Sequence, residues 1–598
     1  MGYMFNFRII FPVLIVLLFL IVSVAVFTNL DEDAFISFRY VDQLYAGNGL
    51  VFNSGERVEG YSNFLWIMLI YLFKMTGFSP VNTARILGIL FALGTAIVGM
   101  YSIRKLVPED AQLSWLFGLW YLLSIPVIYW SQGGLETALI SFLIMCFICC
   151  QTLMGKGWLW VGLWVVLGAF TRPEAHMLVV LYCIVLLCRY QKRECIAGIT
   201  FVGGSLLLYH LMRIMYFGEL LPTPALIKTS GAFTRGLDYL KSFFVGGHYV
   251  WALPFFLYAI IDKSLRKHML VPAGVVILYV VFNLYVGGDY KYHFRFIVPF
   301  IAPFMLVSIV GVCQIKTLFP HRFGKTTVRG VVVLLIILPL FFYHSTYGDK
   351  RSSFAILREG FSDWENRFTG QLKTHMQNYN MCYNVFLGKW IHDNFSPRIS
   401  IAYEQMGQVP YYAGTEYYFI DLIGLTDLYI ANCYKRLHPS PLGLFIKEAC
   451  GIVPFLDTKN LSEKINTVFY PGDPRANQDI VRYVLEKRPE VIMVVAFISV
   501  WHPWVDLFNS QSFRDNYRLA QVFGYRQGVV WQGIDFEENN TIIFFRKDHY
   551  NTFQKFPRCS FIALPHDWFR HYSEPKEVVE WIKRKYPELL PLLYTTTF

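Results

Sequence analysis

The hydrophobic pattern changes partway along the chain. Apolar runs long enough to cross a bilayer recur through the first 345 of 598 residues, which is typical of a polytopic membrane protein. After "LLIILPLFFYHS" (334–345) the sequence becomes mixed and charged, with no further run of that length. The stretches predicted to span the membrane number eleven: 9–28, 82–102, 113–129, 134–153, 157–170, 175–188, 195–216, 248–261, 269–286, 294–313 and 330–344.

Loop charge predicts the orientation of these spans. Segment 62–78 is apolar but short and carries Lys74, so it can either cross the membrane or lie on its surface. If it lies on the surface and the N-terminus is cytoplasmic, the basic loops between spans face the cytoplasm, as the positive-inside tendency requires. This alternative is favoured. It places "DEDAFISFRY", "SQGGLET", "TRPEA", "YFGELLPTPALIK" and "GGDYKYHFRF" together on the outer face.

The predicted architecture has two parts. Residues 1–345 form a transmembrane module with an outer loop at 29–80, and residues 346–598 form a soluble extracytoplasmic domain. The pattern of the domain is mixed α/β, helix-like at 381–395 and strand-like at 398–403, 490–495 and 541–546. Outside the cytoplasm its four cysteines could form up to two disulfides: Cys382, Cys433, Cys450 and Cys559. Side chains that could orient an acceptor, or serve ordinary α/β surface chemistry, are Glu404, Tyr411, Tyr412, Asp421 and Asp427.

Composition and missing motifs narrow the function. The chain is 55% hydrophobic, and much of its net charge of +11 lies in short loops between spans, so no nucleic-acid partner is predicted. The sequence has no nucleotide-binding loop, nucleophile elbow, HExxH helix or nicotinamide fingerprint in a supporting context. A transferase acting on the outer face therefore needs an activated donor that lies in the membrane, for which a polyprenyl-phosphate sugar is the natural candidate.

Three consecutive acids, Asp31, Glu32 and Asp33, follow the first apolar segment. They are predicted to open a helix, where acid suits the N-terminus, with Asn29 as cap and Glu32 completing a capping box. Capping accounts for one or two of the three. A carboxylate held near the membrane surface can instead act as a general base toward an acceptor hydroxyl.

Helical spacing separates these acids onto different faces, since successive residues turn by about 100°. Asp33 shares a face with Ser37 and Tyr40, while Glu32 lines up with Arg39.

Basic residues that depart from the positive-inside pattern flank the outer ends of the spans. Each one alone is explained by snorkelling to lipid headgroups. As a set they could clamp a lipid-linked phosphate. They are Arg39, Arg172, Arg213, Lys228 and Arg295.

Two further loops carry paired glycines next to polar side chains. "SQGGLET" offers Glu136, and "GGDYKYHFR" offers Asp289 and His293, which could hold sugar hydroxyls or a cation if the glycines do more than make turns. An interfacial belt or a sugar-stacking platform would explain the aromatic group Tyr61, Phe64 and Trp66.

The stretch "DEDAFISFRYVDQLYAGNGLVFNSGERVEGYSNFLW" closely resembles the first outer loop of the class C membrane glycosyltransferases (GT-C), within them the terminal β-(1→2)-arabinofuranosyltransferase family. That family typically has D-D-A-[FY]-I-S-x-R-Y, then G-x-G-L-V-F-N-x-G-x-x-V-E-G-[YF]-[ST]-N-P-L-W. Weaker similarities follow in order: "GGLET", "TRPE", "YFGELLP", "GGD" before "RF", and "GQVPYYAG…DLIGLTD". Together they cover most of the chain.

The resemblance implies a GT-C-like fold in which surface helices after the first span cover an outer-face cavity. It assigns Asp33 to catalysis as the second family aspartate, with Glu32 in place of the first. Phe64 in place of proline and Thr223 in place of asparagine are two further departures. The residues predicted to bind sugar or acceptor are Glu59, Tyr61, Asn63, Trp66, Glu136, Asp289 and His293.

The implied reaction moves arabinofuranose from a decaprenyl-phosphate-like donor to a cell-envelope glycan on the outer face of the plasma membrane. The basic set would stabilise the departing phosphate, and Asp33 would be the base in a single displacement. The family's net retention implies instead a carboxylate nucleophile or front-face attack, and these routes stay open. No cofactor is required, and a divalent cation is an alternative.

Two other functions remain as alternatives. One is a GT-C enzyme that moves another polyprenyl-phosphate sugar to pilin, lipopolysaccharide or another surface polymer. The other is a lipid-glycan transporter, which should show repeated topology and interrupted polar spans, whereas here the polar motifs gather at one face.

Overall fold

The computed structural model of the protein covers most of the helical part of the chain and less of the tail. The described residues are 7–26, 30–154, 157–227, 233–289, 291–318, 324–343, 376–437 and 475–495, with short pieces at 503, 506–507, 510–525, 530–531, 534–535, 541–549 and 569–571. The predicted domain boundary at 345 and 346 lies between two described ranges, so it stays a prediction.

The N-terminal part is helical. Apolar runs with good helix formers and polar or glycine-containing ends set the helix limits. The helices are α1 (Phe7–Val26), α2 (Glu32–Tyr45), α3 (Phe64–Lys74), α4 (Pro80–Leu106), α5 (Gln112–Leu122), α6 (Ile125–Gln132), α7 (Thr137–Cys149), α8 (Trp158–Thr171), α9 (Met177–Arg189), α10 (Lys192–Phe217), α11 (Thr223–Ile227), α12 (Phe233–Lys241), α13 (Leu253–Ile261), α14 (Arg266–Val286), α15 (Val298–Leu318) and α16 (Lys325–Phe342).

Four of the described helices, α4, α10, α14 and α16, are long and apolar enough to cross a membrane. The number rises to six if each of two bent pairs is one span: α5 with α6, which meet at 61°, and Phe233–Gly246 with Tyr249–Ile261, which meet at 80°. The last helix of each pair, α6 or α13, has a proline in its first turn, where the backbone N–H has no partner within the helix. The chain is therefore a polytopic helical membrane protein, and the count of eleven spans stays a prediction.

Helix α3 is the ambiguous segment of the sequence. It has only 11 residues, which gives a length of about 16 Å, roughly half of a bilayer core of about 30 Å. Its face with Trp66, Ile67 and Ile70 is buried against the neighbouring helices. This length favours the surface-lying alternative.

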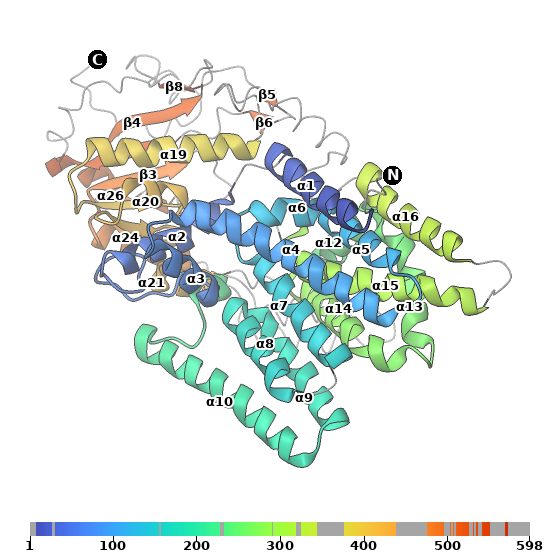
Figure 1. Ribbon diagram of the computed structural model, residues 1–598. Helices are drawn as coiled ribbons and strands as arrows, with labels where there is room; N and C mark the ends of the chain where they lie inside the picture. The colour runs from blue at the N-terminus through green and yellow to red at the C-terminus, as the bar shows by residue number, and fades with distance from the viewer. Residues whose placement is uncertain are drawn as a thin grey trace, which may run out of the picture.

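Burial distinguishes central helices from peripheral ones. Every residue of α7 except Phe142 is buried, whereas only 17% of the spanning window of α10 is covered by the rest of the protein. Figure 1 shows α10 at the edge of the helical part, where its apolar side chains would face lipid.

The tail forms a six-stranded sheet in the order β2-β1-β3-β7-β4-β8. The pairs β1–β2 and β1–β3 are parallel, and the other neighbours are antiparallel. The strands are β1 (Ser400–Tyr403), β2 (Tyr418–Asp421), β3 (Val491–Val495), β4 (Tyr517–Tyr525), β7 (Thr541–Arg546) and β8 (Phe569–His571), with a separate hairpin of β5 (Val530–Trp531) and β6 (Ile534–Asp535). The tail helices are α19 (Met376–Asn394), α20 (Gln408–Ala413), α21 (Leu428–Leu437), α24 (Ala476–Glu486) and α26 (Gln511–Asn516).

The mixed α/β pattern of the tail is thus confirmed, because the predicted helix and strands coincide with α19, β1, β3 and β7. The two-disulfide arrangement is wrong, because Cys433 is a free, buried thiol. The side chains of the other three tail cysteines lie outside the described residues.

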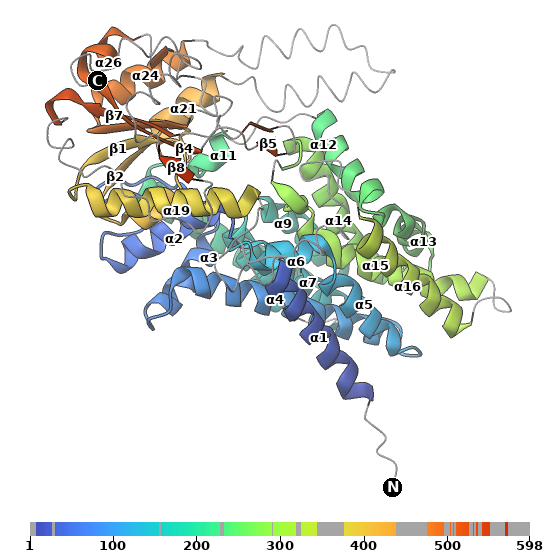
Figure 2. The same ribbon diagram turned by 90° about the horizontal axis from the view of Figure 1, so that it is seen from above.

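The tail packs directly on the first outer loop, as both views show (Figures 1 and 2). Phe35 and Phe38 of α2 share one hydrophobic core with Val409 of α20. At the edge strand β2, the side-chain amide of Asn53 donates to the Phe419 carbonyl at 2.8 Å and accepts from the Phe419 N–H at 3.0 Å. Asn53 therefore pairs with the sheet edge as a neighbouring strand would.

Candidate functional site

The loops predicted to face outward surround one pocket at the junction of the helical part and the tail. Its volume is about 380 Å³, within the range of small-molecule sites. It is lined by α2 and the loop before α3, the turn before α7, the segment after α8, α11, α12, the end of α14 with its following loop, and Leu425 of the tail. Segments separated by as many as 390 residues therefore meet there.

The start of α2 is fixed by its first acid. Asp31 is the N-cap residue, and its carboxylate accepts the Asp33 N–H at 2.9 Å. The Asp31 N–H in turn donates to the Gly133 carbonyl at 2.9 Å, which joins α2 to the turn before α7. The predicted cap, Asn29, lies outside the described residues, and the predicted capping box is wrong because Asp31 takes the N-cap position.

Two neighbouring acids of α2 contact different parts of the protein. Asp33 and Ser37 line the pocket. Glu32 instead accepts the N–H groups of Gly407 and Gln408 at 3.1 and 2.9 Å, at the start of α20. Burial raises the pKa of Glu32 to about 7, although the Gln408 N–H opposes the shift. Glu32 thus contacts the tail and does not line the pocket.

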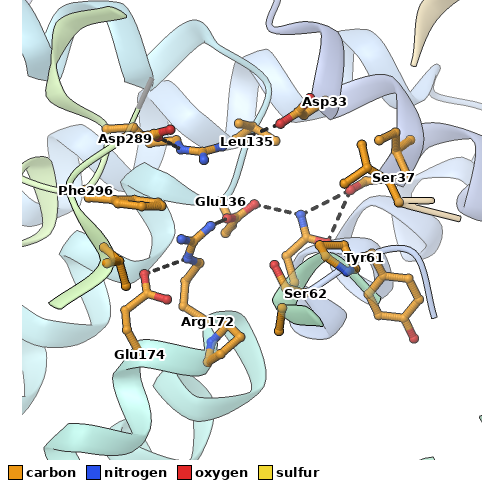
Figure 3. A pocket seen from close by; sticks show the side chains of 18 of the residues that line it. Asp33, Ser37, Tyr61, Ser62, Leu135, Glu136, Arg172, Glu174, Asp289 and Phe296 are labelled. Carbon is orange, nitrogen blue, oxygen red and sulfur yellow. Dashed lines mark hydrogen bonds and ion pairs between the residues drawn. The ribbon is translucent and has the colours of Figure 1, made fainter. Parts of the chain in front are cut away.

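A buried chain of polar groups forms one wall of the pocket. Arg172 lies between Glu136 and Glu174, 2.6 and 2.7 Å from their oxygens, and Asn63 donates to the other oxygen of Glu136 at 2.6 Å. Asn63 also forms hydrogen bonds with Ser37 of α2. Figure 3 shows this series of contacts from Glu174 to Ser37. Burial opposes the charge of Glu136, but Arg172 and Asn63 outweigh it and hold its pKa below the ordinary value.

The loop after α14 forms the opposite wall. Gly288 has a φ of +72°, and a Cβ there would lie 2.5 Å from the Tyr239 ring, so only glycine allows this turn. Beyond the turn, Asp289 accepts from Nε of Arg295 at 2.6 Å. The Phe296 ring centroid lies 5.0 Å from the guanidinium carbon of Arg295. This loop therefore holds the Arg295 cation beside both the Asp289 carboxylate and an aromatic ring.

Cations from this loop also reach α2. Nζ of Lys291 lies 2.8 Å from Oδ1 of Asp31 and 3.3 Å from Oδ1 of Asp33. Nη1 of Arg295 lies 3.9 Å from Oδ2 of Asp33. The Asp33 side chain is 16% exposed, more than those of Asp31, Lys291 and Arg295. A ligand in the pocket would therefore contact Asp33 and Arg295, which both line it, whereas Lys291 contacts Asp33 but is not part of the lining.

Arg39 is not at the pocket. It is 1% exposed, and its guanidinium donates to the carbonyls of Phe52, Pro410, Gly414 and Tyr417 at 2.5 to 3.0 Å. These bonds fix α2 to the tail. The geometry gives no support to the predicted phosphate-binding role of Arg39.

Other predicted residues support the pocket from outside. Arg213 forms a buried ion pair with Glu59 at 2.7 Å, which ties α10 to the first loop. Trp66 is fully buried and donates to the Gly134 carbonyl at 2.9 Å, beside Glu136 in sequence. His293 is buried against Tyr129, with ring centroids 4.6 Å apart.

The aromatic platform is also not formed. Tyr61 lines the pocket, but Phe64 packs against Tyr209 at a centroid distance of 5.6 Å, and Trp66 is covered. Lys228 lies outside the described residues. Of the predicted set, the pocket brings together Asp33, Tyr61, Asn63, Glu136, Arg172, Asp289 and Arg295.

Several side chains at or beside the site lie outside the predicted set. Glu174, Lys291 and Leu425 stand inside quoted motifs, and Glu174 and Lys291 are each two residues from a predicted arginine or aspartate that could have identified them. Arg235 lines the pocket but stands in no quoted motif.

The tail acids support local turns. The Asp421 carboxylate accepts the N–H groups of Ile423, Gly424 and Thr426 at 2.6 to 3.0 Å, and Asp427 accepts that of Ile430 at 3.0 Å. In the part of the chain that the structure describes, no group of three or more His, Cys, Asp or Glu side chains has metal-binding geometry.

Comparison with known proteins gives one match in the tail and two along the chain. A family model described as "Domain of unknown function (DUF8728)" matches residues 371–545. The terminal beta-(1->2)-arabinofuranosyltransferase of Corynebacterium glutamicum is 26% identical over 330 residues, which cover 47% of this chain and 48% of that protein. The one of Mycobacterium tuberculosis is 28% identical over 239 residues, covering 36% and 37%. The chain thus spans about half the length of the first relative and just over a third of the second.

Solved structures give a weaker likeness. ArnT from Cupriavidus metallidurans, bound to undecaprenyl phosphate, has a TM-score of 0.48 and 11% identity, covering 89% of this chain and 97% of that one. The Archaeoglobus fulgidus oligosaccharyltransferase in the apo form has a TM-score of 0.46 and 8% identity, covering 92% and 78%. In sequence, the chain is similar to the terminal β-(1→2)-arabinofuranosyltransferases.

Proposed function

We propose that this protein is a membrane glycosyltransferase of the GT-C type that moves arabinofuranose from a polyprenyl-phosphate donor to a cell-envelope glycan. The sequence similarity to arabinofuranosyltransferases supports the class of reaction. One observation carries the site: Asp33 lines a pocket with its side chain 16% exposed, within 4 Å of two cations that come from a loop more than 250 residues away.

Asp33 acts as the base in this proposal. The acceptor hydroxyl loses its proton to the Asp33 carboxylate while its oxygen bonds the anomeric carbon of the sugar. The bond from that carbon to the phosphate oxygen breaks, and its electron pair leaves with the lipid phosphate. Arg295 and Lys291 lie beside Asp33, where they stabilise the charge on the departing phosphate.

The other wall of the pocket holds the sugar. Glu136 is kept ionised by Arg172 and Asn63, so it accepts hydrogen bonds from sugar hydroxyls and takes no proton near neutral pH. Tyr61 lies in the same lining. In this arrangement Glu136 orients the donor sugar, whereas Asp33 carries the proton transfer.

The proposed location is the outer face of the plasma membrane, with the tail domain also outside. The pocket opens where the predicted outer loops meet the tail, and the donor lipid would reach it from the outer leaflet. A lipid-phosphate donor is consistent with the absence of any nucleotide-binding motif in the sequence.

The test is a transfer assay with the full-length protein in lipid nanodiscs, synthetic polyprenyl-phosphoryl arabinofuranose and an arabinan-like acceptor. We expect turnover by wild type and a loss of about 10²- to 10⁴-fold in Asp33→Asn and Asp33→Ala. The matched control is Asp42→Asn, an acid on the same helix that pairs with Lys74 away from the pocket at 3.0 Å. It should keep its activity.

Two results would count against the proposal. Undiminished turnover in both Asp33 variants would remove this residue from the chemistry. Turnover only with a polyprenyl-phosphoryl hexose would favour the GT-C enzyme that serves another surface polymer.

A further inference from the structure

One ammonium group joins two of the three acids that open α2. Nζ of Lys291 lies 2.8 Å from Asp31 and 3.3 Å from Asp33, and the Lys291 side chain is only 13% exposed. Lys291 comes from the loop between α14 and α15, and Gly288 fixes the turn of that loop against Tyr239. The contact is therefore made between two parts of the chain that are each held in place.

The structure describes charged groups on both sides of Asp33. Asp31 and Glu32 precede it on its own helix, and Glu32 is held by the tail. Lys291 and Arg295 face it from the opposite loop, where Arg295 is also bound to Asp289. The cations that would bind a donor phosphate are thus already engaged by the proposed base and its neighbouring acids.

We propose that Lys291 is a positioning residue that holds Asp33 until the donor arrives and then moves from Asp33 to the donor phosphate. This proposal rests on the function proposed above. Binding of the phosphate to Lys291 removes the cation from the Asp33 carboxylate. Asp33 becomes a stronger proton acceptor only when a donor is in place, so donor binding and base activation are coupled.

The coupling has a measurable sign. If Asp33 and a phosphate compete for Lys291, removal of the Asp33 charge must strengthen phosphate binding, although it abolishes transfer. The gain must depend on the ammonium group, because without it there is nothing to compete for. Direct repulsion between Asp33 and phosphate would give a gain that does not depend on Lys291.

The experiment is a double-mutant cycle on binding of polyprenyl phosphate, the lipid product, to the full-length protein in neutral nanodiscs. We expect Asp33→Asn to lower the dissociation constant, on the order of tenfold, and Lys291→Gln to raise it by a similar factor. In the Lys291→Gln background, Asp33→Asn should change the constant by less than about threefold. Lys291→Arg keeps the charge and should bind close to wild type, and Lys74→Gln, which breaks the pair with Asp42, serves as the control.

A second variant tests the same competition without touching the base. Asp31→Asn removes the other acid on Lys291 but keeps the cap of α2, since asparagine caps as well as aspartate. Asp31 does not line the pocket, so we expect tighter polyprenyl phosphate binding in this variant through Lys291. If Lys291→Gln does not fold, the dissociation constant of Asp31→Asn for polyprenyl phosphate tests the competition for Lys291 in its place.

The outcomes separate the two proposals. No binding of polyprenyl phosphate to wild type would overturn the donor class and with it the proposed function. Binding that Asp33→Asn and Asp31→Asn leave unchanged, or a gain from Asp33→Asn that is as large in the Lys291→Gln background, would overturn the role of Lys291 alone.

Discussion

Glu32 and Asp33 are adjacent in the sequence, yet their carboxylates bind partners 117 residues apart. Oε1 of Glu32 accepts from the N–H of Gln408 in the tail at 2.9 Å, while Oδ1 of Asp33 lies 3.3 Å from Nζ of Lys291 in the loop after α14. A single helical step of about 100° separates these directions. The first turn of α2 therefore holds the tail with one acid and faces the pocket with the next.

We expect Arg39→Lys to loosen the contact between α2 and the tail. A lysine cannot reach the four carbonyls that the guanidinium now satisfies, and each buried carbonyl left without a donor costs about 1–3 kcal/mol. Hydrogen exchange should increase at the amides of 411–419. The control is Arg57→Lys, at an exposed position in the loop between α2 and α3. A higher donor KM with unchanged exchange would instead restore the phosphate-binding role of Arg39.

We expect Arg172→Gln to be among the most destabilising changes at the site. It would leave the carboxylates of Glu136 and Glu174, whose side chains are 2% and 4% exposed, without their shared cation, which costs about 3–5 kcal/mol. Adding Glu136→Gln should recover part of this loss, because one uncompensated charge is then removed. Thermal unfolding of the single and double variants measures both effects. A double variant less stable than Arg172→Gln would contradict the pairing.

The stability of the protein should fall as the pH rises from about 5 to 8. The pKa of Glu32 is raised from 4.5 to about 7 by burial, so between these values the folded state binds more protons than the unfolded state. The contribution is at most about 3 kcal/mol. Glu32→Gln should reduce the difference between apparent melting temperatures at pH 5.5 and 7.5, whereas the exposed Glu486→Gln should not. If both variants show the same difference in melting temperature between pH 5.5 and 7.5, the pH dependence comes from groups other than Glu32.

Gly134→Ala should destabilise the turn that presents Glu136. The residue has a φ of +79°, and a Cβ would lie 2.5 Å from Leu30 and 3.0 Å from Ala34. Gly47→Ala is a matched control, since Gly47 has a φ of +82° but nothing within 4 Å of the added atom. Gly47→Ala should lose only about 1–2 kcal/mol of stability, through backbone strain at a positive φ. Gly134→Ala should lose more stability and should also lower turnover. Equal losses would show that crowding against α2 is unimportant.

Periodicity predicted the part of the fold that depends on local pattern. The apolar runs predicted the helices, and the short strand-like stretches predicted β1, β3 and β7. Helical spacing alone predicted that Asp33 and Ser37 share one face of α2 and that Glu32 and Arg39 share another. In the structure the first face lines the pocket and the second contacts the tail. Loop charge predicted these loops on one side of the membrane, and seven of the predicted residues meet in the pocket, while the side that they face stays a prediction.

The rest depended on contacts that no local pattern carries. Arg39 and Arg213 were predicted as phosphate ligands because they flank the predicted outer ends of spans, but backbone carbonyls of the tail pair with Arg39 and Glu59 pairs with Arg213. Lys291 escaped notice because its importance comes from Asp31 and Asp33, 260 and 258 residues earlier in the chain. Long-range ion pairs between loops are set by tertiary packing, and a single sequence does not reveal them.

The pairing of Asn53 with Phe419 bears on what happens to the tail by itself. Strand β2 is the border of the six-stranded sheet, and a loop of the helical part occupies its outward hydrogen-bonding groups. A tail fragment made without that loop would present a bare strand able to zip onto another copy, so self-association, rather than unfolding, is the expected failure of such a fragment in isolation.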